Sequence, residues 1–254
     1  MRLSELTERL DEELRTADYA DVDASANGLQ VGPEETEVER VAFAVDAAEA
    51  TIAAAADGDA DLLVVHHGLS WGGFERVTGE HYRRIAPLIE ADLPLYVSHL
   101  PLDGHPTLGN AAGICDLLDL RDCDPFGTIG PEPIGRLGRA SEPYDVDELK
   151  GRLDGLDQGG RETQVLEFGP GEIESVAVVT GSGADFLEAA VEAGADALVT
   201  GEGKGKLYHQ ARETGIHVFL AGHYATETFG VRALADLVET WGPETTYVDH
   251  PTGL

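Results

Sequence analysis

The stretch VAFAVDAAEATIAAAADGDADLLVVHHG, residues 41–68, decides the fold. It starts with a short apolar run (41–45), continues with an alanine-rich segment (47–56) and ends in a second apolar run (61–65) followed by two histidines. Continuous apolar runs are typical of strands buried on both faces, and alanine favours helix. The stretch therefore predicts a strand, a helix and a second strand parallel to the first.

The same pattern returns 135 positions later. Residues 176–177 repeat the Val-Ala of residues 41–42, and residues 196–199 repeat the spacing of the Asp-Leu-Leu-Val at 61–64 without a gap. Apolar strands resemble one another by chance, which is the simpler explanation. We favour an internal α/β repeat, because polar clusters also recur after the strands.

The rest of the chain continues the alternation of strands and helices. A first helix is expected with Ser4 as its N-cap and Leu6, Leu10 and Leu14 on one face, followed by a loop over 27–33. Further strands are expected at 93–98, 163–168, 175–180, 195–200, 217–221 and 245–249, and helices at 81–90, 107–118, 146–153 and about 225–241.

A Pro/Gly-rich stretch over 125–138 reads as a boundary between two halves. We therefore predict an α/β fold of two similar α/β domains, residues 1–125 and 126–254. Each domain is expected to hold a mostly parallel sheet with helices on both faces, and the metal site described below is expected between the halves.

The composition is strongly acidic, with 48 Asp and Glu against 17 Lys and Arg and a formal net charge of −31. This charge repels phosphate backbones and anionic lipids, so neither nucleic acid nor a membrane is expected as a partner. Lysine occurs only at 150, 204 and 206. Few lysines among many acids predict a halophilic protein, and a merely acidic cytosolic protein is the alternative. If the halophilic interpretation holds, the melting temperature rises between about 0.1 and about 2 M KCl, and a flat or falling value contradicts it.

Cysteine usage and apolar runs indicate a cytoplasmic protein. The two cysteines, Cys115 and Cys123, are too few for a disulfide framework and form no paired metal motif. The opening MRLSELTERL lacks an apolar signal core, and no apolar run approaches 18 residues.

Three polar clusters follow directly after apolar strands, at 64–68, 97–103 and 220–227. In open α/β sheets, ligands bind at the carboxyl ends of the strands. The candidate metal ligands there are His66, His67, His99, Asp103, His223 and Glu227. Imidazole and carboxylate suit Zn, Mn, Fe(II), Co or Ni. These candidate ligands outnumber the three protein ligands that one catalytic zinc needs. Two metal ions that share a carboxylate are therefore expected.

Each of these residues also has an ordinary structural explanation. A single histidine after a strand is commonly a hydrogen-bonded loop residue, whereas adjacent histidines at a buried strand end require partners. The glycine-rich 181–183 and 201–205 could approach phosphate, but neither is a Walker A loop, and plain turns explain both. The histidines at 81, 217 and 250 are interpreted as structural, and those at 105 and 209 as weaker site candidates.

The residues together resemble the GTP cyclohydrolase I type 2 homologue family, also described as Nif-three-like dinuclear metal hexameric proteins. The matching stretches are NGLQVG (27–32), VVHHGLSW (64–71), SHLPLD (98–103), ALVTGEG (197–203) and AGHYATE (221–227). Residues 100–101 are Leu-Pro, where the family often has Thr-Asn.

The resemblance implies two divalent metal ions per chain. It implies that His67 and Asp103 hold one ion, that His66 and His223 hold the other, and that Glu227 bridges both. His99 then lies behind the ligands or carries protons, and we give His209 the same catalytic role as an expectation. A ring-shaped homo-hexamer is also implied.

The activity that the resemblance implies is metal-dependent hydrolysis of a small molecule, a nucleotide such as GTP. Two other classes of function use the same residues. One is a two-metal phosphoesterase, and the other is a non-catalytic metal-binding or interaction protein, because membership of a family does not prove turnover.

Overall fold

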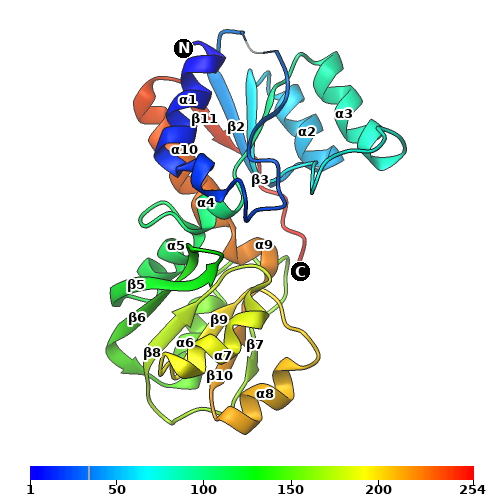
Figure 1. Cartoon of the computed structure of the whole chain (residues 1–254). Coiled ribbons are helices and arrows are strands. Elements are labelled where there is room, and N and C mark those ends of the chain that lie inside the picture. The colour runs from blue at the N-terminus through cyan, green and yellow to red at the C-terminus, as the bar shows by residue number, and fades with distance from the viewer. Residues whose placement is uncertain (34) are drawn as a thin grey trace. The chain divides into compact units, whose positions relative to one another are not determined.

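The computed structural model describes residues 1–33 and 35–254, and it confirms an α/β fold with two sheets (Figure 1). The chain divides into two compact units. The first unit comprises Met1–Leu102 and Gly230–His250, and the second comprises Asp103–Phe229 and Pro251–Leu254.

The first unit, described at every residue but 34, holds a five-stranded sheet in the order β1-β4-β3-β2-β11. Its strands are β1 (Gly28–Val31), β2 (Arg40–Asp46), β3 (Leu62–His67), β4 (Leu95–Val97) and β11 (Glu244–Tyr247). Strand β1 is antiparallel to β4, and the other neighbours are parallel. The sheet is therefore mostly parallel, as predicted, with an added edge strand where a loop was expected.

Helices cover both faces of this sheet. The helices α1 (Leu3–Leu14) and α10 (Thr228–Trp241) lie on one side, and α2 (Glu49–Asp57) and α3 (Glu80–Glu90) lie on the other (Figure 1). The buried core towards α2 and α3 includes Leu63 and Val65 of β3 together with Ile52 and Leu88. The alternation of side chains along a strand sends the neighbouring residues to the opposite face.

Helix α1 confirms the leucine pattern but not its predicted start. Leu3, Leu6, Leu10 and Leu14 are all buried on one face. The N-cap residue is Arg2 and not Ser4, so that prediction was wrong. The helix starts earlier because Leu3 belongs to the buried stripe and its N–H donates to the carbonyl of Thr36 (2.8 Å).

The second unit, which is described throughout, holds a six-stranded sheet in the order β5-β6-β8-β9-β10-β7. Its strands are β5 (Leu120–Ile129), β6 (Glu132–Tyr144), β7 (Gln164–Leu166), β8 (Ile173–Val178), β9 (Ala197–Thr200) and β10 (His217–Leu220). The strands β8, β9 and β10 are parallel, whereas β5, β6 and β7 join antiparallel. This sheet is mixed rather than mostly parallel.

The antiparallel part comes from the stretch that the sequence presents as a boundary. Residues 125–138 belong to the β5–β6 hairpin, which turns at Gly130 with φ +59°. Pro125 hides the strand in the sequence, but it lies on β5, which is an edge strand where a missing N–H is tolerated. The hairpin therefore extends the second sheet instead of linking two domains.

Helices also cover both faces of the second sheet. The core on one side combines α5 (Asn110–Leu117) and α6 (Val146–Leu153) with β8, β9 and β10. On the other side lie η2 (Gly183–Phe186), α7 (Leu187–Glu192) and α8 (Leu207–Thr214), and α7 is seen in front of the strands in Figure 1. Cys115 and Cys123 are both free thiols, and burial raises the pKa of Cys115.

The strand registers agree with the 135-residue repeat. Val41 pairs with Leu62 in the first sheet, and Val176 pairs with Ala197 in the second. The aspartate before the second strand repeats as well. The Asp61 carboxylate accepts the N–H groups of residues 39 and 40, and the Asp196 carboxylate accepts those of residues 174 and 175, all within 3.0 Å. Equivalent polar anchors at one offset are strong support for an internal repeat.

The division into units differs from the predicted boundary at 125/126. The first unit ends at Leu102 and regains residues 230–250. The physical reason is that β11 pairs with β2, which returns the last strand to the first sheet.

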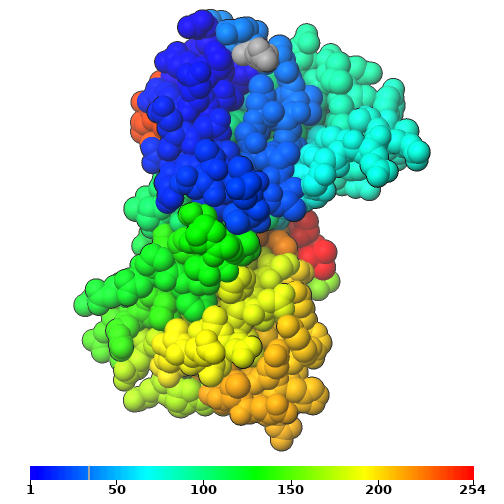
Figure 2. All heavy atoms as spheres, viewed as in Figure 1, coloured from blue at the N-terminus to red at the C-terminus, as the bar shows by residue number. Residues whose placement is uncertain are grey.

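Figure 2 shows the segment after β3, coloured cyan, at the surface of the first unit. Over residues 1–33 and 35–254, no helix is long and apolar enough to cross a membrane.

Candidate metal centre

Three histidines gather at the carboxyl ends of two neighbouring strands in the first unit. Strand β3 ends in His66 and His67, and His99 follows β4. One nitrogen from each ring lies within 4.8 Å of the other two. The ring centroids are 4.6 Å apart for His66 and His67, and 5.1 Å for His66 and His99. The parallel pairing of β3 and β4 therefore produces the cluster that the sequence predicts.

Each of these rings is fixed through its Nδ1 atom. His66 Nδ1 donates to the carbonyl of Ser98 (2.9 Å), His67 Nδ1 to Asp46 (2.8 Å), and His99 Nδ1 to Asp23 (2.9 Å). A hydrogen bond at Nδ1 sets the tautomer and makes Nε2 the ligating atom. Histidines that bind metals in proteins are held in this way by a carboxylate or a carbonyl.

Asp23 is the most strongly anchored of these supporting groups. Its carboxylate accepts hydrogen bonds from His99, from the Asn27 amide and from the N–H groups of Ser25 and Leu100. Burial raises the pKa of Asp23, but the His99 hydrogen bond and charge, with the Asn27 and Ser25 bonds, outweigh it and hold the pKa below its usual range. Asp23 therefore remains ionised and fixes the His99 ring.

Carboxylates form the corresponding cluster of the second unit. Asp103 ends α4 (Leu100–Asp103), and its Oδ1 accepts from the Asn110 amide (2.8 Å) and the Thr180 hydroxyl (3.3 Å). An oxygen of Asp103 lies within 4.8 Å of an oxygen of Glu227. His223 opens α9 (His223–Thr226), and its Nε2 is 3.2 Å from Glu227 Oε2. Glu227 thus lies close to both Asp103 and His223.

Two glycines of this unit leave the space in which Glu227 and His223 lie. Gly181 has φ +55°, and a Cβ there would meet Glu227 Oε1 at 2.0 Å and His223 Nε2 at 3.0 Å. A Cβ on Gly201 would meet the His223 Cα at 2.7 Å. The glycine-rich stretches at 181–183 and 201–205 therefore accommodate the candidate ligands, a role that the sequence patterns did not predict.

The basic residues of the same loops are paired with one acidic neighbour. Lys204 and Lys206 both form ion pairs with Asp185, the latter at 2.8 Å. Hydrogen bonds from Lys204 and Lys206 lower the pKa of Asp185 to about 2. These ammonium groups therefore neutralise a carboxylate of their own unit.

The remaining histidines lie in neither cluster of the described residues. His209 is exposed on α8, where its ring contacts Tyr208 with centroids 5.4 Å apart. His105 accepts the N–H groups of Thr107 and Leu108 through Nδ1. His217 is buried against Gly169 and Pro170, in keeping with its structural interpretation. The proton-carrying role of His209 stays a prediction.

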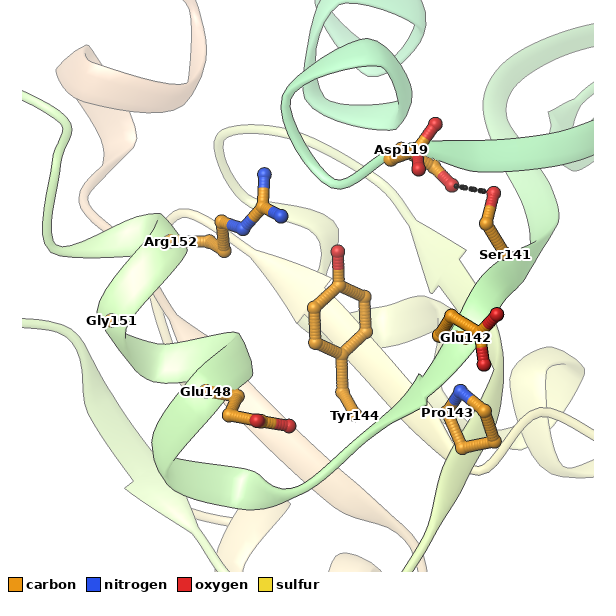
Figure 3. A pocket seen from close by; sticks show the side chains of 8 residues that line it. All are labelled: Asp119, Ser141, Glu142, Pro143, Tyr144, Glu148, Gly151 and Arg152. Carbon is orange, nitrogen blue, oxygen red and sulfur yellow. Dashed lines mark hydrogen bonds between the residues drawn. The ribbon is translucent and has the colours of Figure 1, made fainter.

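Two cavities of the second unit differ in their relation to the candidate ligands. One of about 210 Å³ is lined by Gly201, Glu202 and Gly222, next to His223. The other, of about 500 Å³, lies between β6 and α6 (Figure 3). Tyr144 stands inside it and donates to the carbonyl of Leu118 (2.7 Å), but none of the predicted site residues lines it.

The donor set fits divalent transition metals. The first unit offers imidazole nitrogens with their tautomers fixed, and the second offers two anchored carboxylates and one imidazole. Mixed imidazole and carboxylate donors suit Zn, Mn, Fe(II), Co and Ni, and do not distinguish among them. Possible metal binding is therefore supported by the chemistry of these residues.

Asp46→Ala should weaken metal binding about 10- to 100-fold, because the His67 ring loses the carboxylate that orients it and raises its basicity. Asp57→Ala is the control, since it removes the same charge from an exposed position on α2. Titration of each metal-free variant with Zn²⁺ in a competing chelator measures the affinity. Equal affinities in the two variants would contradict the role of Asp46.

Comparisons with known proteins identify the family of this chain. The family model described as Duf34/NIF3 (NGG1p interacting factor 3) matches residues 1–250. A "GTP cyclohydrolase 1 type 2 homolog" from Halobacterium salinarum is 56% identical to this chain, and one from Pyrococcus abyssi is 43% identical. Both alignments cover the full length of both proteins.

Solved structures of related proteins have the same fold as this chain. The structure of the protein ybgI, described as of unknown function, has a TM-score of 0.91 and 34% identity, with all of both chains covered. The structure of TTHA1606 from Thermus thermophilus has a TM-score of 0.90 and 39% identity over the same share. The chain therefore belongs to the Duf34/NIF3 family.

Proposed function

We propose that this chain is a dinuclear metal-dependent hydrolase that acts on a nucleotide such as GTP. The observation that carries the proposal is the fixed Nδ1 atom of each of three clustered histidines, which leaves Nε2 of each ring as the atom available to a metal or a proton. Histidines that bind metals almost always have the other ring nitrogen held in this way. The names of the curated relatives supply the substrate class.

The proposed ligands are His66, His67, Asp103, His223 and Glu227, with Glu227 shared by both ions. The connectivity of the chain supports joint use of the two clusters. The chain leaves the first unit between Leu102 and Asp103 and returns after Phe229. Asp103 is the first residue after the chain leaves the first unit, and Glu227 lies three residues before Gly230, where the chain returns. Two cations held by these residues would supply Lewis acidity and would lower the pKa of water towards about 7.

His99 is the proposed proton carrier. Its Nδ1 is bound to the ionised Asp23, so a proton taken up at Nε2 gives an imidazolium that this carboxylate stabilises. In the proposed reaction, water adds to C8 of the guanine, the imidazole ring opens, and a second water releases formate. The proton that the attacking water loses passes to His99 and then to the leaving nitrogen.

We also propose that the chain assembles as a cytoplasmic homo-hexamer, as the family resemblance implies. Light scattering in high salt tests the assembly. A mass near six times the 27.0 kDa of one chain is expected, and a mass near one chain contradicts it.

Incubation of the metal-loaded chain with GTP in about 2 M KCl tests the activity. Formate should appear with the ring-opened nucleotide, and Glu227→Gln should abolish its release. Phosphate without formate would instead identify a two-metal phosphoesterase. If neither product forms, the metal-binding protein is not a hydrolase of GTP, and the proposal fails.

A further inference from the structure

A large aromatic side chain stands exposed beside the histidine cluster of the first unit. Trp71 follows β3 by four residues and is 49% exposed. Its ring centroid is 4.9 Å from that of His99 and 6.1 Å from that of His67. Its position next to candidate ligands, rather than its exposure, points to a binding role, because ligand sites are lined by aromatic side chains with a few polar groups.

The backbone holds Trp71 in this place although it lies in a loop. Residues 25 and 71 form an isolated antiparallel bridge. On either side of it, the Gly72 N–H donates to the carbonyl of Ala24 (2.7 Å), and the Ala26 N–H donates to that of Ser70 (3.2 Å). The segment that Trp71 pairs with also carries Asp23, which fixes His99. Trp71 and His99 therefore share one support.

The ring geometry leaves room for a stacked ligand. The Trp71 and His99 rings are nearly perpendicular, at 81°. In such an edge-to-face pair, the imidazole covers at most one face of the indole. After Trp71 the chain turns away through Gly72 (φ +79°) and Gly73 (φ +102°), and a Cβ on either glycine would meet nothing within 4 Å. Because Trp71 is 49% exposed, part of its indole surface is available to a planar ring.

The side chains that support the rings beside Trp71 are acidic, so any attraction for phosphate comes from the proposed cations and not from the surroundings of the indole. The side chains that hold His67 and His99 are the carboxylates of Asp46 and Asp23. Carboxylates repel phosphate, whereas an aromatic heterocycle is attracted to indole by stacking and is indifferent to their charge. Every base has a π-face, and stacking on an aromatic side chain contributes substantially to binding.

We propose that Trp71 is the stacking platform for the base of the substrate, so that the substrate class is a purine nucleoside or nucleotide recognised through its ring. This inference rests on the proposed function and adds the subsite that orients the base beside His99. The phosphates contribute little to binding at this subsite.

Tryptophan fluorescence tests the subsite directly, because the chain has two tryptophans. The variant Trp241→Phe keeps Trp71 as its sole tryptophan, and the variant Trp71→Phe keeps Trp241. Each metal-loaded variant is titrated in high salt with guanosine, GTP and inorganic tripolyphosphate. Guanosine and GTP should quench Trp71, and tripolyphosphate should not. Trp241, which lies against Arg9, should respond to none of them and corrects for absorption by the base.

Equilibrium dialysis of guanosine supplies the second measurement. Trp71→Ala should raise its Kd at least about tenfold, whereas Trp71→Phe, which keeps an aromatic face, should stay within about threefold of the unchanged chain. The unchanged chain, Trp71→Ala and Trp71→Phe should bind equal amounts of metal. Equal metal content shows that His99 and its neighbours are intact. An unchanged Kd in Trp71→Ala, quenching by tripolyphosphate alone, or no guanosine binding would overturn the subsite.

The outcomes separate the subsite from the hydrolase proposal. If guanosine binds through Trp71 but GTP yields no formate, the subsite stands and the proposed activity fails. If formate is released and kcat/KM is the same in Trp71→Ala, the activity stands and the subsite fails.

Discussion

Glu227→Gln is expected to reduce the bound metal from about two ions per chain to well under one, whereas Asp103→Asn should leave roughly one. Both substitutions remove one charge and keep the side-chain size. The difference arises from the proposed sharing of Glu227. A bridging carboxylate uses one oxygen for each ion and offsets the repulsion between two dications, so its loss weakens both ions. Asp103 serves one ion.

The pair of variants is well matched, because both carboxylates lie in the second unit, and an oxygen of each lies within 4.8 Å of the other. Elemental analysis of the purified variants, after dialysis against metal-free buffer in high salt, gives the number of ions per chain. Equal metal loss in both variants, or full retention in Glu227→Gln, would contradict the bridging role. Melting curves show whether each variant is folded.

Gly181→Ala is expected to lower both the stability and the metal content of the chain. Alanine at φ +55° is strained, and its Cβ would lie 2.0 Å from Glu227 Oε1. The strain costs about 1–2 kcal/mol and the overpacking about 1–3 kcal/mol. To relieve the contact, the Glu227 carboxylate must move, so metal binding should fall with stability.

Gly194→Ala is the control for Gly181→Ala. Gly194 has φ +75°, but a Cβ there would meet nothing within 4 Å. Gly194→Ala should therefore lower the free energy of unfolding by about 1–2 kcal/mol only, and its metal content should be unchanged. Denaturant titration at fixed KCl measures the free energy, and elemental analysis measures the metal. If the two variants behave alike, Gly181 has no specific relation to Glu227.

The sequence marks the candidate ligands more clearly than it marks the residues that support them. The three clusters at strand ends were visible because polar residues interrupt apolar runs, and the structure brings them together within each unit. Asp23 and Asp46 could not be found in this way. Asp23 reaches His99 across 76 positions, and Asp46 reaches His67 across 21. Among 48 acidic residues, nothing local marks these two.

The fold shows the same limit. Strands β2, β3, β8, β9 and β10 are continuous apolar runs, and the sequence predicts all of them. The β5–β6 hairpin was missed because Pro125 and its glycines hide the alternation of an edge strand. The return of β11 to the first sheet is a long-range pairing with β2, which no local pattern encodes.

Glycines give a signal that was present but misinterpreted. The stretches at 181–183 and 201–205 were explained as ordinary turns or phosphate loops, since small residues suit both. The structure shows that Gly181 and Gly201 are pressed against Glu227 and His223. Gly201 directly follows β9 and Gly181 comes three residues after β8, whereas His223 follows the neighbouring parallel strand β10. Small residues after strands that lie beside the strand before a candidate ligand are the pattern that could have indicated this role.

Anomalous diffraction from metal-loaded crystals, recorded on both sides of the metal absorption edge, tests the central claim of a dinuclear centre most directly. Two peaks per chain are expected, about 3.5–4 Å apart, with Glu227 contacting both. His67 and Asp103 should contact one peak, and His66 and His223 the other. A single peak per chain, or two peaks that Glu227 does not join, would contradict the account.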